Sequence, residues 1–555
     1  MATYAGSKRV KNPEKWDGRR HKGAAFLAGA MAGMGMTIAM LALILLGITP
    51  RSVANLVADR IAALAGPGIT EFFIQTIGSL GKEFLFLTVL LGQVVAGGLL
   101  GLLLAFITGA TRRRNVIWRN SFVISTAVWL FFVLAGLPLL DQGFMGVALG
   151  NDQISTLVIS FLLFQLFGLM VGYAYLMLVP SGRRFHEDVT EEELQDLNEK
   201  QLNDLAATTQ SDLQVSRRRF VGFVSGVFVL MVGAAIGTKA FGAPTTSQYR
   251  ATLGVLRPDG TLEGEVTPTD NFYQVSKNAF NPKVDGAGWK LEINGLVDKP
   301  LTFNLDDISK MPRQTVYHTL TCISNPVGGD LIGNAKWSGV RLADLLQMAG
   351  VKQNVEKVVF TCADGYKDSI TIDKALEPNT IFALEMNGAP LTQDHGYPGR
   401  MLIPNIYGMK NAKWVTSVTV IDTDFEGFWQ KQGWDNVATI KTQSTIVSPV
   451  DQSMVKGGEK TTIRGEAFAG SRNIAKVEVS TDNGQTWVEA QVKPRLGPNA
   501  WTLWSLDWTP PADSGKTYIL KVRAVEEGNK VQDPNEADPA PSGSSGYHTI
   551  SVRTM

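Results

Sequence analysis

The sequence predicts a multidomain protein: an N-terminal helical transmembrane bundle, then a mixed α+β domain, and finally an immunoglobulin-like β-sandwich. Five long apolar runs fall within the first 245 residues of the 555-residue chain. From residue 265 onward strands alternate with short helices, and from residue 441 short alternating strands are separated by Gly, Asn, Pro and Asp. A chain of this length is expected to contain more than one domain.

The first part of the chain is expected to cross a lipid bilayer five times. Residues 1–23 form a basic N-terminus, and residues 24–180 contain four apolar runs. Each run approaches the roughly 20 residues that a membrane-spanning helix needs. The four runs are 24–48, 83–107, 120–140 and 154–179, and a fifth span is expected at 220–242.

Clusters of arginine predict the orientation of these spans. They occur at 112–114, 183–184 and 217–219, which lie on one side of the bilayer if the runs cross it in turn. Basic residues concentrate on the cytoplasmic side, so residues 181–219 are expected to form a cytoplasmic connector. Because the number of spans is odd, the linker 243–264 and the chain after it are expected on the extracytoplasmic side.

The residue types in the apolar runs limit the functions that the membrane bundle is expected to have. No histidine lies in a run, and two cysteines cannot supply a Cys-x-x-Cys-His motif, so we expect no haem, flavin or iron–sulfur cluster. Gln93 and Gln165 fit either a quinone pocket or hydrogen bonds between helices, of which the second is commoner. The scarcity of ionisable residues argues against transport, so the bundle is interpreted mainly as an anchor and docking platform.

The overall composition excludes two further classes of protein. The chain has 52 basic and 51 acidic residues and a formal net charge of +1, so it shows no basic footprint for nucleic acid. Its two cysteines are too few for a small disulfide-stapled scaffold.

Local patterns define the two domains that follow the linker. Residues 265–440 contain strand-like segments at 289–297 and 357–361 and short helical segments at 342–349 and 373–376. Residues 441–555 contain alternating segments at 476–480, 501–508 and 518–524. Asp482-Asn-Gly484 is a hairpin-turn sequence, as expected in an antiparallel sandwich. The tryptophans of this region are expected in its core.

Cys322 is the most informative single residue. It ends the alternating run 315–321 and precedes a glycine-rich loop, where a thiolate is well placed to bind a soft metal. A small buried hydrophobe is the alternative. Cys362 ends the apolar run 358–361 and is expected in the core, although a Cys322–Cys362 disulfide would remove the metal ligand.

Several segments in a fixed order carry a family resemblance. They are 267–273, 289–300, the run around Cys322, 395–404 and 407–414. Together they resemble the sulfite oxidase family over residues 265–555, with a molybdopterin-binding domain at 265–440 and a dimerisation domain at 441–555. The resemblance implies that Cys322 ligates molybdenum beside a pyranopterin dithiolene.

The same resemblance suggests further site residues. Asn271 and Tyr273 are implied to lie against the pterin, and His395 to contact the cofactor. Tyr366 is a candidate substrate-side hydroxyl. The cations suited to the cofactor phosphate and the pterin oxygens are Arg400, Lys410 and Lys413.

An export signal is consistent with such a cofactor. The segment 216–221, Ser-Arg-Arg-Arg-Phe-Val, resembles a twin-arginine signal, although basic residues also flank many membrane helices. Since a pterin is loaded in the cytoplasm, its protein must cross the membrane folded, which favours the export interpretation.

His318 lies an even number of residues before Cys322 and is expected on the same strand face.

These features predict a membrane-anchored, exported molybdopterin-dependent oxidoreductase that catalyses oxygen-atom transfer and exchanges electrons with an external redox partner, a cytochrome or quinone-linked protein. The substrate is expected to be a small oxyanion or a sulfoxide. No basic residue follows Cys322 until Lys336, so an anion would need charge from Lys336, Arg341 or Lys367. A sulfoxide reductase of the same family and a non-catalytic, membrane-anchored binding module are the alternatives, and a homodimer through 441–555 is possible.

Overall fold

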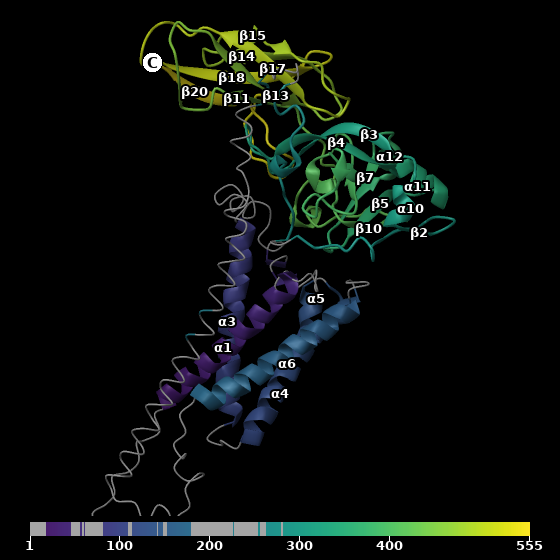
Figure 1. Cartoon of the computed structure of the whole chain (residues 1–555), viewed down its shortest axis with the longest axis vertical. Coiled ribbons are helices and arrows are strands. Elements are labelled where there is room, and N and C mark those ends of the chain that lie inside the picture. The colour runs from purple at the N-terminus through teal and green to yellow at the C-terminus, as the bar shows by residue number, and fades with distance from the viewer. Residues whose placement is uncertain are drawn as a thin grey trace, which may run out of the picture. The chain divides into compact units, whose positions relative to one another are not determined.

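The computed structural model describes residues 18–45, 56–57, 60–61, 81–108, 114–140, 142–147, 153–178, 222, 226, 253–255, 262–278 and 281–555. The chain divides into two compact units, one of residues 1–58 and 84–238 and one of residues 59–83 and 239–555. Each unit is described by itself (Figure 1).

The first unit is built from long apolar helices. They are α1 (Gly18–Leu45), α3 (Gly81–Thr108), α4 (Arg114–Phe131), which continues through a π-helical turn (Phe132–Gly136) into α5 (Leu137–Leu139), and α6 (Gln153–Leu178). By length and composition, four stretches are able to cross a membrane: Lys22–Leu43, Thr88–Thr108, Arg114–Leu139 and Gln153–Leu178. Their positions agree with four of the five expected runs. The fifth run and the connector 181–219 lie outside the described residues, apart from two isolated positions, and so does most of the linker.

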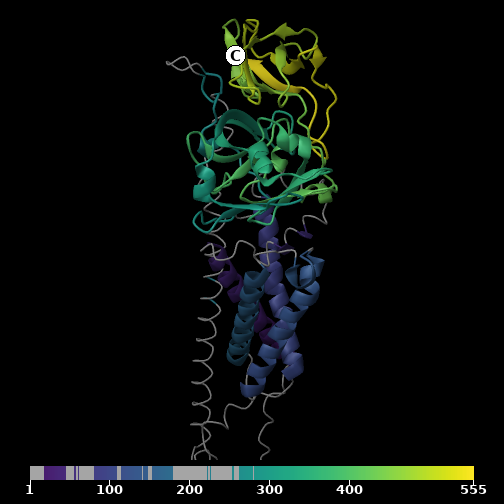
Figure 2. The ribbon, with the colours of Figure 1, turned by 90° about the vertical axis from the view of Figure 1, so that its right-hand side faces the viewer.

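Glycines and paired polar side chains join these helices, which run side by side in Figure 2. A Cβ at Gly29 of α1 would overlap the carbonyl oxygen of Gly97 in α3, so the close approach of the two backbones requires glycine. The Thr37 hydroxyl donates to Gln93 Oε1 at 3.3 Å. The Gln165 Nε2 group donates to Thr126 at 3.1 Å. Both glutamines therefore make the hydrogen bonds between helices that the sequence left open.

Two sheets form the α+β domain of the second unit. The first has the strand order β2-β1-β10-β5-β6, in which only β1 and β10 are parallel. The second has the order β3-β4-β7-β8, with β9 also paired to β7. Their bounds are β1 Lys290–Gly295, β2 Leu301–Asn304, β3 Gln314–Thr321, β4 Ile332–Arg341, β5 Lys357–Cys362, β6 Lys367–Thr371, β7 Ile381–Met386, β8 Ala389–Pro390, β9 Arg400–Leu402 and β10 Val415–Ile421.

Short helices cover and connect these sheets. They are α10 (Leu305–Ser309), α11 (Leu342–Ala349), α12 (Ile372–Leu376) and the 3-10 turns η4 (Thr269–Asn271), η5 (Gly408–Lys410) and η6 (Gln430–Gln432). The bounds of α11 match the expected helix 342–349, because its apolar residues recur on one face and Gly350 ends it with φ of +69°. Strands β1 and β5 lie where strands were expected.

The C-terminal domain consists of two sheets around a shared core. One has the order β11-β13-β17-β16 and the other β12-β20-β18-β14-β15, with β19 on β18. Their bounds are β11 Gln443–Ser448, β12 Ser453–Val455, β13 Thr461–Phe468, β14 Ile474–Ser480, β15 Val488–Glu489, β16 Gln491–Val492, β17 Thr502–Trp508, β18 Thr517–Glu526, β19 Lys530–Val531 and β20 His548–Thr554. Ile463 and Trp504 of one sheet share a buried cluster with Val477 and Val522 of the other, so the expected β-sandwich is present. Asn483 and Gly484 both have positive φ, as the expected turn requires.

The C-terminal domain is hydrogen-bonded to the strand that leads to Cys322. The backbone N–H of Thr319 in β3 donates to the carbonyl of Asn499 at 2.9 Å. The N–H of Trp501 donates to the Thr319 hydroxyl at 2.8 Å. The Trp501 ring also belongs to the core cluster of the α+β domain. The end of β3 is therefore fixed by both domains.

Candidate active site

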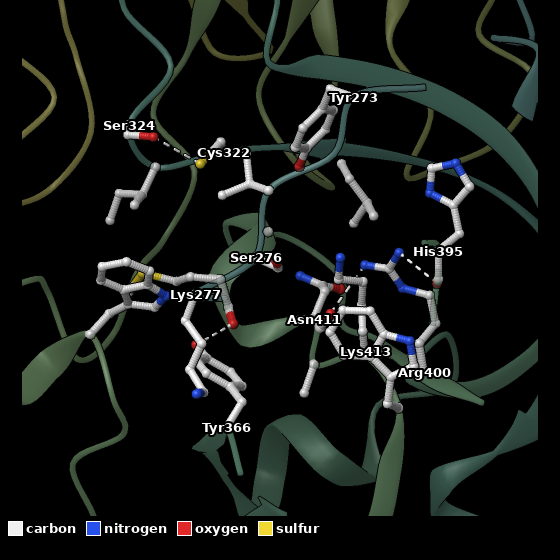
Figure 3. A pocket seen from close by; sticks show the side chains of 18 of the residues that line it. Tyr273, Ser276, Lys277, Cys322, Ser324, Tyr366, His395, Arg400, Asn411 and Lys413 are labelled. Atoms are coloured by element: carbon white, nitrogen blue, oxygen red, sulfur yellow. Dashed lines mark hydrogen bonds between the residues drawn. The ribbon is translucent and has the colours of Figure 1, made fainter. Parts of the chain in front are cut away.

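A cavity of about 900 Å³, counting the part that is open to solvent, lies in the α+β domain at the end of β3. This size suits a cofactor or a small ligand. Figure 3 shows Cys322 and Ser324 at one end of the group of side chains and His395, Arg400 and Lys413 at the other. Tyr273 and Tyr366 also line the cavity. The structure therefore brings together six of the eight predicted site residues: Cys322, Tyr273, Tyr366, His395, Arg400 and Lys413.

Cys322 is held at the point where the β3–β4 loop closes. Its backbone N–H donates to the Leu331 carbonyl at 2.9 Å, and its own carbonyl accepts from the N–H of Asn325 at 3.1 Å. The side chain lines the cavity and is only 6% exposed. No disulfide joins Cys322 to Cys362, which packs in the hydrophobic core as expected. The Cys322 sulfur is therefore directed into the cavity as a candidate metal ligand.

Arg400 brings a buried positive charge to the opposite end. It lies on β9, is 5% exposed, and stacks with its guanidinium carbon 5.2 Å from the centre of the Trp337 ring. Its Nη1 and Nη2 groups donate to the carbonyls of His395 and Asn411 at 3.2 and 3.1 Å.

The guanidinium of Arg400 nevertheless lacks a negative partner. Its Nε atom is buried without a hydrogen bond, and no carboxylate among the described residues forms a salt bridge with it. Burial lowers the pKa of Arg400 to about 10, so the group remains charged near neutral pH. A buried cation without a counter-ion is unfavourable by itself, and this arrangement suits an anionic ligand.

Two further predicted residues lie near Arg400. His395 Nε2 lies 2.9 Å from the carbonyl oxygen of Thr269, and burial lowers the pKa of His395 to about 4. The ring is therefore neutral at pH 7, with Nε2–H donating to that carbonyl and Nδ1 as an acceptor. Lys413 donates from Nζ to the Asp394 carbonyl at 3.0 Å and lies 4.3 Å from the centre of the Trp414 ring.

The two tyrosines have different surroundings. Burial raises the pKa of Tyr273 well above its usual value, and the nearby Cys322 raises it further. The Tyr366 hydroxyl lies 2.7 Å from the Met409 carbonyl and 2.9 Å from Asp368 Oδ2. Burial also raises the pKa of Tyr366. Both phenols therefore remain protonated at neutral pH, and the hydroxyl of Tyr366 is already engaged by the protein.

Two predicted residues do not line the cavity. Asn271 ends η4, immediately before the cavity-lining Phe272. The Lys410 side chain is 2% exposed, and its Nζ donates to Asp368 Oδ1 and to the Ser369 carbonyl, both at 2.8 Å. His318 also lies outside the cavity lining, and burial lowers its pKa to about 3.

Several cavity residues were missed by sequence reasoning. Lys277 is the most important, because it brings a further cation to the cavity, with its ammonium group beside Tyr366 in Figure 3. Its Nζ donates to Asn278 Oδ1 at 2.9 Å and lies 5.5 Å from the centre of the Phe428 ring. A lysine four residues after Tyr273 was the available signal. Trp429 and Trp434 lie before and after η6 in the chain and both line the cavity, which no local pattern indicates.

The expected alternative cations lie elsewhere. Lys336, Arg341 and Lys367 are absent from the cavity lining. The Lys336 side chain is exposed, and Arg341 pairs with Asp344 at 2.6 Å. Lys277 therefore replaces all three as the candidate cation for the substrate in this cavity.

Comparisons with known proteins identify relatives of the two domains that follow the linker. The family profile "Oxidoreductase molybdopterin binding domain" matches residues 278–429, and "Mo-co oxidoreductase dimerisation domain" matches residues 435–544. Sulfite oxidase of Arabidopsis thaliana is 31% identical over 331 residues, which cover 49% of this chain and 83% of that protein.

Other relatives are matched over less of their length. Mitochondrial sulfite oxidase of Mus musculus is 31% identical over 50% of this chain and 58% of its own length. An NADH nitrate reductase of Volvox carteri is 30% identical over 44% of this chain and 35% of its own length. The solved structure of the sulfane dehydrogenase SoxCD from Paracoccus pantotrophus aligns over 53% of this chain and 82% of that one, with 25% identity and a TM-score of 0.47.

Proposed function

This chain belongs to the sulfite oxidase family of molybdopterin-dependent oxidoreductases, and on that premise we propose that it oxidises a small oxyanion of the sulfite class at the cavity beside Cys322. Water supplies the oxygen atom, and the reaction releases two protons and two electrons as sulfite becomes sulfate. The electrons pass singly to a separate redox protein, a cytochrome or quinone-linked protein. The observation that carries this proposal is the cavity that holds both the Cys322 thiol and the buried, unpaired charge of Arg400.

The residues present fit a molybdenum–pyranopterin group. Cys322 offers a thiolate for the metal, and the unsatisfied Nε of Arg400 offers a charged donor for the phosphate or the pterin. Tyr273, His395 and Lys413 present a phenol, an imidazole and an ammonium group along the same cavity. When bound, the group supplies two-electron chemistry with oxygen-atom transfer.

Lys410 and Asn271 are proposed to support the cavity from outside its lining. Lys410 supports the cavity through its ion pair with Asp368, because its ammonium group is already saturated by protein oxygens. Asn271 orients the segment that carries Tyr273. Neither residue is proposed to contact the cofactor.

Lys277 is proposed to recognise the substrate charge. Its ammonium group lies beside Tyr366, as Figure 3 shows, on the side of the cavity away from Arg400 and Lys413. The indole rings of Trp429 and Trp434 form apolar walls that limit the access of water. Exclusion of water strengthens the attraction between the lysine and an anion. Tyr366 shapes the wall, and its hydroxyl is held in place by Asp368.

A sulfoxide reductase of the same family is the second candidate. The loop 323–331 after Cys322 contains no basic residue, and most of the exposed cavity surface is apolar. These features suit a neutral substrate with a small apolar substituent. The sequence also allowed a binding module without catalysis. Membership in an oxidoreductase family argues against that interpretation.

The N-terminal helices are proposed to anchor the enzyme in the cytoplasmic membrane. Support comes from the four stretches long and apolar enough to cross it. We further propose a fifth span at 220–242, an export signal at 216–221 and an extracytoplasmic location for residues 243–555. A homodimer through the C-terminal domain is supported by the match to the dimerisation profile at residues 435–544.

Metal analysis with electron paramagnetic resonance (EPR) tests the function. Full-length protein is purified in detergent from a host that makes the cofactor, and its spectrum is recorded before and after anaerobic sulfite. We expect about one molybdenum per chain and a Mo(V) signal that appears with sulfite. Molybdenum with no response to sulfite, together with reoxidation by a sulfoxide of the dithionite-reduced protein, would favour the second candidate. A protein without molybdenum would refute both.

A further inference from the structure

Ser324 makes a direct contact with the proposed metal ligand. Its hydroxyl oxygen lies 3.0 Å from the sulfur of Cys322, and its side chain is 4% exposed (Figure 3). Both residues line the cavity. The sulfur is the one hydrogen-bond partner of the Ser324 hydroxyl that we find among the described residues.

The direction of this hydrogen bond depends on the state of the sulfur. When Cys322 is a thiol, either atom has a proton to donate. When the sulfur is a thiolate bound to metal, it has none, so the serine hydroxyl must be the donor. A hydrogen bond to a ligating sulfur withdraws electron density from it and favours the reduced metal.

The loop around Ser324 is fixed from the C-terminal domain. The Ser544 hydroxyl donates to the Asn325 carbonyl at 2.8 Å. The His548 ring packs so closely on Gly328 that a Cβ at that glycine would overlap it. Within the loop, Asn325 Oδ1 accepts from the Leu331 N–H at 2.9 Å. These contacts hold the backbone on one side of Ser324, while the loop closure at Cys322 holds the other.

We propose that Ser324 is a positioning residue that donates a hydrogen bond to the metal-bound sulfur of Cys322 and thereby raises the reduction potential of the metal. This inference rests on the proposed ligation of molybdenum by Cys322. The segment 544–548 of the C-terminal domain supports it by fixing the loop. A higher potential makes the metal a better electron acceptor, which serves oxidation of the substrate.

The test is an EPR-monitored redox titration of the full-length, molybdenum-loaded protein. Ser324→Ala removes the donor and is expected to shift the midpoint potentials of the molybdenum to more negative values. Ser324→Thr keeps a hydroxyl and is expected to retain the wild-type potentials. Ser324→Cys keeps a side chain of similar size with a weaker donor. Its midpoint potentials are expected to lie between those of Ser324→Ala and wild type. This variant provides a second measurement if Ser324→Ala binds little molybdenum.

Ser276→Ala is the matched control. Ser276 also lines the cavity, but its hydroxyl oxygen lies 2.8 Å from Asn281 Oδ1 and 3.1 Å from the Asn278 carbonyl oxygen, so its hydrogen bond goes to one of these acceptors. Its removal is therefore expected to leave the potentials unchanged. Wild-type potentials in the alanine variant would overturn the inference while leaving the proposed function intact. The inference also fails if threonine shifts the potentials as far as alanine does. A wild-type protein without molybdenum would overturn the inference and the proposed function together.

Discussion

The ammonium nitrogen of Lys410 lies 2.8 Å from Oδ1 of Asp368, and the two side chains are only 2% and 0% exposed. Lysine and aspartate are rarely so deeply buried unless they are paired. The Asp368 carboxylate also contacts the Tyr366 hydroxyl at 2.9 Å, and Tyr366 lines the cavity. The ion pair therefore connects η5, which carries Lys410, to a wall of the candidate site.

Replacing Lys410 by methionine is expected to destabilise the protein. The change leaves the Asp368 carboxylate buried without its cation, which typically costs about 3–5 kcal/mol. Chemical denaturation of the full chain, followed by tryptophan fluorescence, measures the loss. The double variant Lys410→Met/Asp368→Leu removes both charges and is expected to recover much of it. Normal stability of Lys410→Met combined with loss of molybdenum would instead show that Lys410 binds the cofactor.

The two cysteines provide a matched pair for the metal site. Cys322→Ser is expected to abolish sulfite oxidation and the substrate-induced Mo(V) signal, because the proposed thiolate ligand is lost. Cys362→Ala is expected to retain both, since Cys362 packs in the hydrophobic core. Its cost is expected to be limited to stability, about 1 kcal/mol for a small cavity. Equal losses in the two variants would contradict the assignment of Cys322 as the ligand.

Much of the fold was predictable because its signals are local. The helix 342–349 was placed correctly, because Leu342, Leu345, Leu346 and Ala349 follow helical spacing and glycine comes next. The four described apolar helices follow from length and hydropathy alone. The place of Cys322 at the end of a strand was likewise evident, since the alternating run before it is strand β3.

The rest of the site depends on contacts between distant segments. Nothing near Lys410 distinguishes a buried lysine from one that faces a ligand, because its partner Asp368 lies on a different strand. Lys277, Trp429 and Trp434 reach the cavity from segments about 150 residues apart in the chain. The contact of Ser544 with Asn325 spans two domains. Such proximity is set by tertiary packing and leaves no periodic pattern in the sequence.

Arg400→Met is expected to weaken cofactor retention. The variant removes the buried charge that the proposed anion would neutralise, and charged hydrogen bonds of this kind contribute about 1.5–3 kcal/mol. The molybdenum content after gel filtration measures the loss. The Arg400→Met variant without cofactor should be no less stable to heat than the wild-type protein without cofactor, since an unpaired buried cation is unfavourable. If the cofactor-free variant unfolds at a much lower temperature, the main role of Arg400 is structural.

Lys277→Met is expected to raise the KM for sulfite about 10-fold to 100-fold, which corresponds to roughly 1.4–2.7 kcal/mol, with a smaller effect on kcat. The variant loses the candidate cation that lines the cavity beside Tyr366. Lys277→Arg should retain most of the affinity, and Lys336→Met, at an exposed position outside the cavity, should have no effect. Steady-state kinetics at two ionic strengths measure these changes. An unchanged KM in Lys277→Met would place the anion elsewhere or favour a neutral substrate.

His318 predicts how acid affects stability. Burial lowers its pKa in the folded protein to about 3, compared with a usual value of 6.5, so the folded state excludes a proton that the unfolded chain accepts. The neutral ring therefore contributes stability above pH 6.5, and this contribution is lost as the pH falls from 6.5 to about 3, by an amount on the order of 3–5 kcal/mol. His318→Gln removes the titration, so its unfolding temperature should fall less steeply than that of wild type across this interval. Parallel pH profiles for the two proteins would contradict the prediction, because His318 would then have the same pKa in both states.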